Sequence, residues 1–138
     1  MTARVSETPN EHRWTLEGHR ITQLSLDLTS FRFLTWTLDA SAEVRLASPF
    51  TFREPDGVER IIDPEEPEQV SPLLSLLGRN IDVLVATRQG ELTLAFGDGS
   101  SLRALPHPRT DAWEVQGGGA LEGMAYRCAP GGGVPWGR

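Results

Sequence analysis

Residues 78–105 show the clearest alternation of apolar and polar positions in the chain. The apolar positions are Ile81, Val83 and Val85, then Leu92, Leu94 and Phe96, and then Leu102 and Leu105. A period of two residues puts one face of a strand into a core and the other into water. Gly90 and Gly99 separate the three runs, and glycine suits hairpin turns because it adopts positive φ at no steric cost. The segment is therefore predicted to be a three-stranded β-meander.

A second, similar pattern lies in the first half of the chain. Apolar alternation and turn residues predict strands over residues 19–28, 31–38, 43–46 and 50–52. The alternation changes phase at Phe33-Leu34, which favours a β-bulge or a strand buried on both faces. Aligned with each other, residues 16–57 and 76–119 form two related pseudo-repeats and indicate a pseudo-twofold architecture. The alternative is the convergence of two ordinary meanders.

One helix is predicted between the two halves, over about residues 68–77. Val70, Leu73, Leu74 and Leu77 have the i, i+3, i+4, i+7 spacing of an apolar helix stripe. Ser71-Pro72 suits a helix start, and Gly78 stands where a C-terminal capping glycine belongs. The stripe is expected to cover a sheet.

These elements predict an α+β fold that is mostly β, with two related β-meanders forming a sandwich or partly open barrel and one packed helix. Residues 14–138 are predicted to be a single domain, and the polar, aperiodic residues 1–13 a disordered arm. The predicted core is Ile21, Leu24, Leu26, Phe33, Trp36, Leu38, Val44, Leu46, Leu73, Leu74, Leu77, Ile81, Val83, Val85, Leu92, Leu94, Phe96 and Trp113.

The charged residues are unevenly distributed along the chain, which the pattern of apolar positions does not show. Residues 54–69 hold seven acids and one cation, Arg60, and the twelve acids and twelve arginines elsewhere cancel, so the whole net charge of −6 lies in this segment. Such a concentration attracts a cationic partner and repels nucleic acid. The alternative explanation is that acids gather at a helix N-terminus to complement its dipole. The predicted binding residues are Glu59, Asp63, Glu65, Glu66, Asp111 and Trp113.

Catalytic and metal chemistry find little support in the sequence. Cys128 is the only cysteine, and it could be a thiolate partnered by His19 or His107, but a lone cysteine in an apolar strand is usually an inert core residue. The histidines at positions 12, 19 and 107 do not have the spacing of zinc ligands. No cofactor motif is present, and no apolar run is long enough to span a membrane. We expect a cytoplasmic protein without catalytic residues, metal or cofactor.

Three functions agree with these patterns. The favoured one is a non-catalytic protein-binding module, of immunity or accessory type, whose acidic surface meets a cationic protein. The first alternative is a small-ligand or enzymatic site in a barrel mouth lined by Arg103, Asp111 and Trp113. The second is a structural protein that self-associates through its edge strands.

Several short motifs in the second half occur together. They are Leu76-Leu77-Gly78, the hairpin from Gly90 to Gly99, Asp111-Ala112-Trp113-Glu114, and a Pro130-Gly131-Gly132 tail followed by Trp136. In this combination the chain resembles a family of small uncharacterised actinobacterial proteins, with Asp111 where that family usually has Glu. The resemblance implies a shared fold and lineage, and no activity.

Overall fold

The computed structural model describes residues 4–132, so Trp136 of the tail motif lies outside the described residues. The strands are β1 (Arg4–Glu7), β2 (Glu11–Leu26), β3 (Phe31–Trp36), β4 (Ala40–Leu46), β5 (Phe50–Arg53), β6 (Glu59–Ile62), β7 (Asn80–Thr87), β8 (Leu92–Phe96), β9 (Ser101–Ala104), β10 (Trp113–Gly119) and β11 (Ala125–Arg127). A 3-10 helix, η1 (Pro67–Leu76), lies between β6 and β7. The predicted fold, mostly β with one helix, is confirmed, and so is the meander β7–β8–β9.

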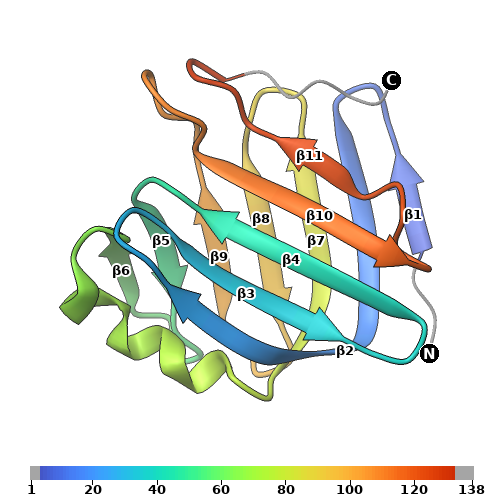
Figure 1. Ribbon diagram of the computed structural model, residues 1–138, viewed down its shortest axis with the longest axis horizontal. Coiled ribbons are helices and arrows are strands. Elements are labelled where there is room, and N and C mark those ends of the chain that lie inside the picture. The colour runs from blue at the N-terminus through green and yellow to red at the C-terminus, as the bar shows by residue number, and fades with distance from the viewer. Residues whose placement is uncertain (1–3, 133–138) are drawn as a thin grey trace.

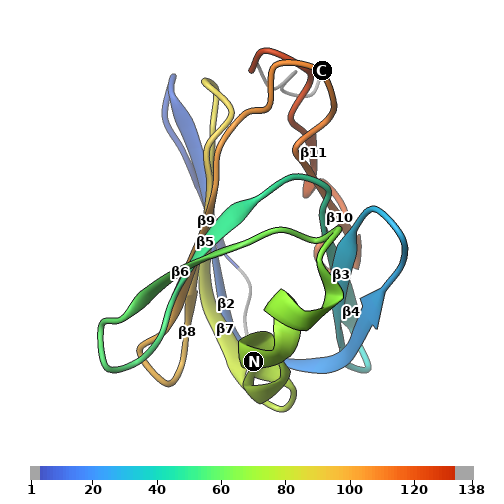
Figure 2. The ribbon, with the colours of Figure 1, turned by 90° about the vertical axis from the view of Figure 1, so that its left-hand side faces the viewer.

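The eleven strands form one antiparallel sheet in the order β11-β10-β4-β3-β2-β7-β8-β9-β5-β6, with β1 paired to β2 beside this path. The sheet does not close, and it folds over on itself (Figure 1). Figure 2 shows the resulting two layers, one with β3, β4, β10 and β11 and the other with β5 to β9. Of the two predicted architectures, a sandwich and a partly open barrel, the structure shows the sandwich, with two layers and an open sheet.

The long strand β2 joins the layers. Its first part pairs with β7 as far as Arg20, and from Ile21 onward it pairs with β3. The register with β7 shifts between Thr15 and His19, next to Gly18, whose φ is 85°. A bulge with glycine in the left-handed region bends a strand sharply, and so lets β2 pass from one layer to the other.

The strand order is symmetric about the central β2–β7 pair. Each strand from β2 to β6 has a counterpart five strands later, from β7 to β11. If every strand is replaced by its counterpart, the strand order becomes the same order read from the other end of the sheet. Each half forms a three-stranded meander, and its next strand pairs with the meander of the other half: β5 with β9, and β10 with β4. The two halves are therefore interlocked, and neither half completes its layer alone.

The core lies between the layers and under η1. The Phe33 and Phe96 rings, from opposite layers, meet edge to face with centroids 6.3 Å apart. Figure 2 shows η1 at an open side of the sandwich, and Val70, Leu73 and Leu76 are its buried residues. The predicted core residues that are buried are Ile21, Phe33, Val44, Leu46, Leu73, Ile81, Leu92, Leu94, Phe96 and Trp113, and Leu24 is partly buried.

Three predicted core residues in the first half are instead exposed. Trp36 is 68% exposed, Leu38 is fully exposed, and Leu26 is 42% exposed. The phase of β3 does not change at Phe33-Leu34 as predicted, because the strand keeps one alternation and turns Trp36 outward. Leu38 lies in the turn after β3 and has no strand neighbour to cover it.

Val83 and Val85 were also predicted to be buried, and the structure places them on the outer face, partly covered. The register of β7 with β8 shifts between Ile81 and Val83. This irregularity reverses the alternation after Ile81, so that Leu84 and Ala86 enter the core.

The helix has a different geometry from the predicted one. It is a 3-10 helix with Pro67 in its first turn and Pro72 inside, and proline inside an α-helix would clash with the carbonyl four residues earlier. With three residues per turn, Val70, Leu73 and Leu76 share a face. Leu74 and Leu77 therefore point outward, at 61% and 55% exposure.

The prediction of a disordered arm over residues 1–13 differs from the structure. Residues Arg4–Glu7 form β1 and pair with the beginning of β2, in a hairpin around Thr8. The signal was missed because β1 is exposed from Val5 onward and Val5 is its only apolar residue, so no apolar alternation marks the strand. Residues 1–3 lie outside the described residues.

Candidate functional site

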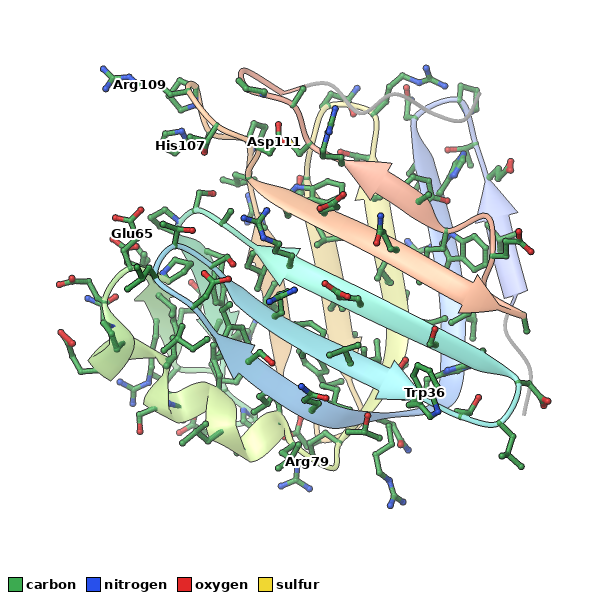
Figure 3. All side chains as sticks on the ribbon, in the orientation of Figure 1. Trp36, Glu65, Arg79, His107, Arg109 and Asp111 are labelled. Atoms are coloured by element: carbon green, nitrogen blue, oxygen red, sulfur yellow. The ribbon has the colours of Figure 1, made fainter. Side chains whose placement is uncertain are left out.

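The acidic segment, residues 54–69, occupies the β5–β6 turn, strand β6 and the approach to η1. Strand β6 is the last of its layer and pairs only with β5 in the described chain, so its other backbone edge is unpaired. Glu59, Glu65 and Glu66 are exposed and Asp63 is half-buried. The four acids that the sequence selected therefore lie on one edge of the molecule, with Glu65 visible beside β5 and η1 in Figure 3.

Ion pairs neutralise little of this charge. Within residues 4–132, Glu54 is the only one of the seven acids in an ion pair, and its partner is Arg60. Asp56 and Asp63 each accept a backbone N–H two residues ahead, at 3.0 Å, and so stabilise turns without losing charge. Glu66 is the N-cap residue of η1 and Glu68 lies in its first turn, so the helix dipole can account for these two acids but not for those of the β5–β6 turn and β6.

A hollow of about 280 Å³ opens between three loops at this edge. The link from β4 to β5 lines it with Ala47, Ser48 and Pro49, the approach to η1 with Asp63 and Glu65, and the β9–β10 loop with His107 and Thr110. The hollow thus joins two of the predicted acids to residues that are distant in sequence.

His107 is held in place by its own loop. The backbone N–H of Arg109 donates to His107 Nδ1 at 3.0 Å. In the neutral ring, Nε2 then carries the proton. Sequence reasoning missed His107, Ser48 and Thr110 as site residues, since the prolines on both sides of His107 indicate only a rigid loop.

In the described part of the chain, the three residues of the predicted barrel mouth have separate surroundings. Trp113 is completely buried, and its Nε1 donates to the Gly90 carbonyl at 2.9 Å. Asp111 is ion-paired with Arg127 at 3.4 Å, and Arg103 with Glu91 at 2.8 Å. Trp113 is therefore a core residue, and within residues 4–132 the structure does not bring its side chain together with Asp111 and Arg103 at a common opening.

A further polar cluster holds the layers together. Trp14 Nε1 donates to the Tyr126 hydroxyl at 2.8 Å, and His12 Nδ1 lies 2.7 Å from the same oxygen. Trp14 and His12 belong to β2 and Tyr126 to β11, so the cluster fastens β11 to the opposite layer. Burial raises the pKa of the Tyr126 hydroxyl, which keeps it protonated at neutral pH.

Cys128 belongs to the core. It is completely buried, and burial raises the pKa of its thiol, so that the thiolate needed for nucleophilic attack is disfavoured. Among residues 4–132, no group of three His, Cys, Asp or Glu side chains is placed to hold a metal ion.

Buried His19 predicts a pH-dependent stability. It is 2% exposed, its Nδ1 has no hydrogen-bond partner among the described residues, and burial lowers its pKa from 6.5. The unfolded chain therefore takes up this proton at a higher pH than the folded chain, and stability falls as the pH drops below about 6.5. We expect urea unfolding between pH 8 and 5 to show this loss in the native protein and a smaller loss in His19→Gln. Equal pH dependence of the two proteins would contradict the assignment.

The comparisons with known proteins give a family and nothing further. A family model described as "Family of unknown function (DUF6188)" matches residues 12–137. No curated protein and no solved structure matches the chain. In the part of the chain that the structure describes, no helix has the length and apolar character needed to cross a membrane.

Proposed function

The chain belongs to the DUF6188 family, whose function is unknown. From the geometry of its acidic edge, which carries Glu59, Asp63, Glu65 and Glu66, we propose that it is a non-catalytic protein-binding module for a cationic partner. The role is of the immunity or accessory type, in which one protein binds and covers a surface of another. The proposal places the protein in the cytoplasm. The actinobacterial origin implied by the resemblance stays a prediction.

One observation carries the proposal. Among residues 4–132, six of the seven acids of the segment have no ion pair, while acids elsewhere, such as Asp98 and Asp111, have arginine partners. Uncompensated charge on one edge creates a local negative potential that speeds encounter with a cationic surface and disfavours anionic ones. The unpaired edge of β6 adds backbone donors and acceptors beside these charges.

The proposal predicts that partner capture depends on the position of the acids. A variant with Glu59, Glu65 and Glu66 changed to Gln and Asp63 to Asn should recover much less partner in a pull-down at low salt. The matched control changes Asp39 to Asn and Glu43, Glu114 and Glu122 to Gln, which alters the net charge equally on β4, β10 and their turns. Native-level recovery by the first variant would contradict the proposal.

A further inference from the structure

We propose that the hollow between the three loops receives the guanidinium group of an arginine side chain of the partner. The inference rests on the proposed function, because it takes a cationic protein as the partner and specifies the group that the hollow recognises. It goes beyond general charge attraction, since it assigns different roles to acids inside and outside the hollow.

The hollow has room for the end of a side chain and lies just below the size of pockets that enclose a whole small ligand. Its volume is about 280 Å³. Pockets that enclose a drug-sized ligand measure roughly 300–1,000 Å³. Its walls come from the β4–β5 link, the approach to η1 and the β9–β10 loop, so it is formed only when both halves of the fold are assembled.

The lining is rich in hydrogen-bond acceptors. Asp63 uses Oδ1 to accept the Glu65 N–H, which leaves Oδ2 available, and the Glu65 carboxylate makes no hydrogen bond within residues 4–132. Ser48 is only 6% exposed and lines the hollow, yet its hydroxyl has no hydrogen-bond partner in the described structure. Its oxygen is not among the fully buried atoms that lack a partner, so solvent reaches it, and it can accept a hydrogen bond from a donor that enters the hollow.

Arginine fits these acceptors better than lysine does. A guanidinium offers five N–H donors in a plane and gives up its water more readily than an ammonium, so it can serve two carboxylates and a hydroxyl together. The nearby arginines of the chain itself are directed elsewhere. Arg60 pairs with Glu54, and Figure 3 shows Arg109 extending away from Glu65 at the far end of its loop.

The first test is a titration with N-acetyl-arginine amide followed by two-dimensional amide NMR of the whole chain. We expect millimolar binding with shifts confined to residues 47–49, 63–65 and 107–110. N-acetyl-citrulline amide, which has nearly the same shape without the charge, should cause no such shifts. Absence of shifts at these residues with the arginine probe, or equal shifts with both probes, would overturn the inference.

Two variants of equal charge complete the test. Asp63→Asn with Glu65→Gln neutralises the hollow while keeping an acceptor for the turn at Asp63, and Glu59→Gln with Glu66→Gln neutralises acids outside it. The first pair should weaken probe binding by roughly tenfold or more, as expected for hydrogen bonds between charged groups, and the second pair should leave it unchanged.

The outcomes separate this inference from the proposed function. If both double variants weaken binding of the arginine probe equally, the hollow has no special role and the inference fails, while capture of a partner by the acidic edge still stands. If the probe binds the hollow as expected but neutralising all four acids leaves partner recovery in the pull-down unchanged, the proposed function fails and the hollow remains an arginine site.

Discussion

Trp113→Ala is expected to lower the free energy of unfolding by about 3–5 kcal/mol, the usual cost of removing a large buried aromatic side chain. Trp113 has no exposed surface, and its indole N–H bonds to the Gly90 carbonyl in the turn between β7 and β8. The substitution therefore leaves a cavity between the layers and a buried carbonyl without a donor. Urea unfolding followed by far-ultraviolet circular dichroism measures the change.

Trp36→Ala is the matched control. Trp36 is 68% exposed on the outer face of β3, so its removal should change stability by less than about 1 kcal/mol. If Trp113→Ala does not fold, Trp113→Phe, which fills most of the space but lacks the N–H, should fold and lose about 1–3 kcal/mol. A loss as large for Trp36→Ala as for Trp113→Ala would contradict the assignment of Trp113 to the core and Trp36 to the surface.

Gly117→Ala is expected to destabilise the protein by about 1–3 kcal/mol or more, because overpacking against backbone cannot be relieved by a rotamer change. A Cβ at Gly117 would collide with the carbonyl oxygen of Leu121, in the turn between β10 and β11. That turn is tight because the Gly117 N–H donates to the Met124 carbonyl at 2.7 Å. Urea unfolding again gives the magnitude.

Gly97→Ala provides the comparison for this effect. The nearest atom to a Cβ at Gly97 is Asn80 Cβ, at an ordinary contact distance of 3.7 Å. Its stability should stay within about 1 kcal/mol of the native value. Similar losses in Gly97→Ala and Gly117→Ala would show that glycine is required for some reason other than the collision with Leu121.

The parts of the fold that sequence reasoning predicted are those specified locally. The meander β7–β8–β9 follows from alternating residues and from turns in which Gly90 and Gly99 have positive φ, so no distant contact is needed to recognise it. The pairing of β5 with β9 and of β10 with β4 has no comparable local signal, because it depends on which meander edge each strand reaches.

The wrong predictions of burial occur where a strand or helix departs from the regular period that was assumed for it. The shift after Ile81 exchanged the faces of Val83 and Leu84, and the 3-10 geometry of η1 replaced Leu77 with Leu76 in the core. Trp36 was placed in the core because large aromatic residues are usually buried, and the steady alternation of β3 outweighed that tendency.

Only some residues of the candidate site could be predicted from the sequence. The charge of residues 54–69 could be counted directly, and it selected Asp63 and Glu65. Ser48 and His107 could not be selected, since they are distant in sequence and only the crossing of β5 into the other half's layer brings them to the same hollow. Trp113 was predicted both in the core and in a barrel mouth, and its complete burial agrees with the core prediction.

The central claim is that the acidic edge binds a cationic protein, and the salt dependence of affinity tests it most directly. The dissociation constant of the purified partner should rise steeply between about 0.01 M and 0.15 M salt, where the screening length falls from about 30 Å to 8 Å. At low salt, the variant of Glu59, Asp63, Glu65 and Glu66 should bind roughly tenfold more weakly or worse, and the charge-matched control should bind as the native protein does. An affinity that is independent of salt and equal in all three proteins would contradict the claim.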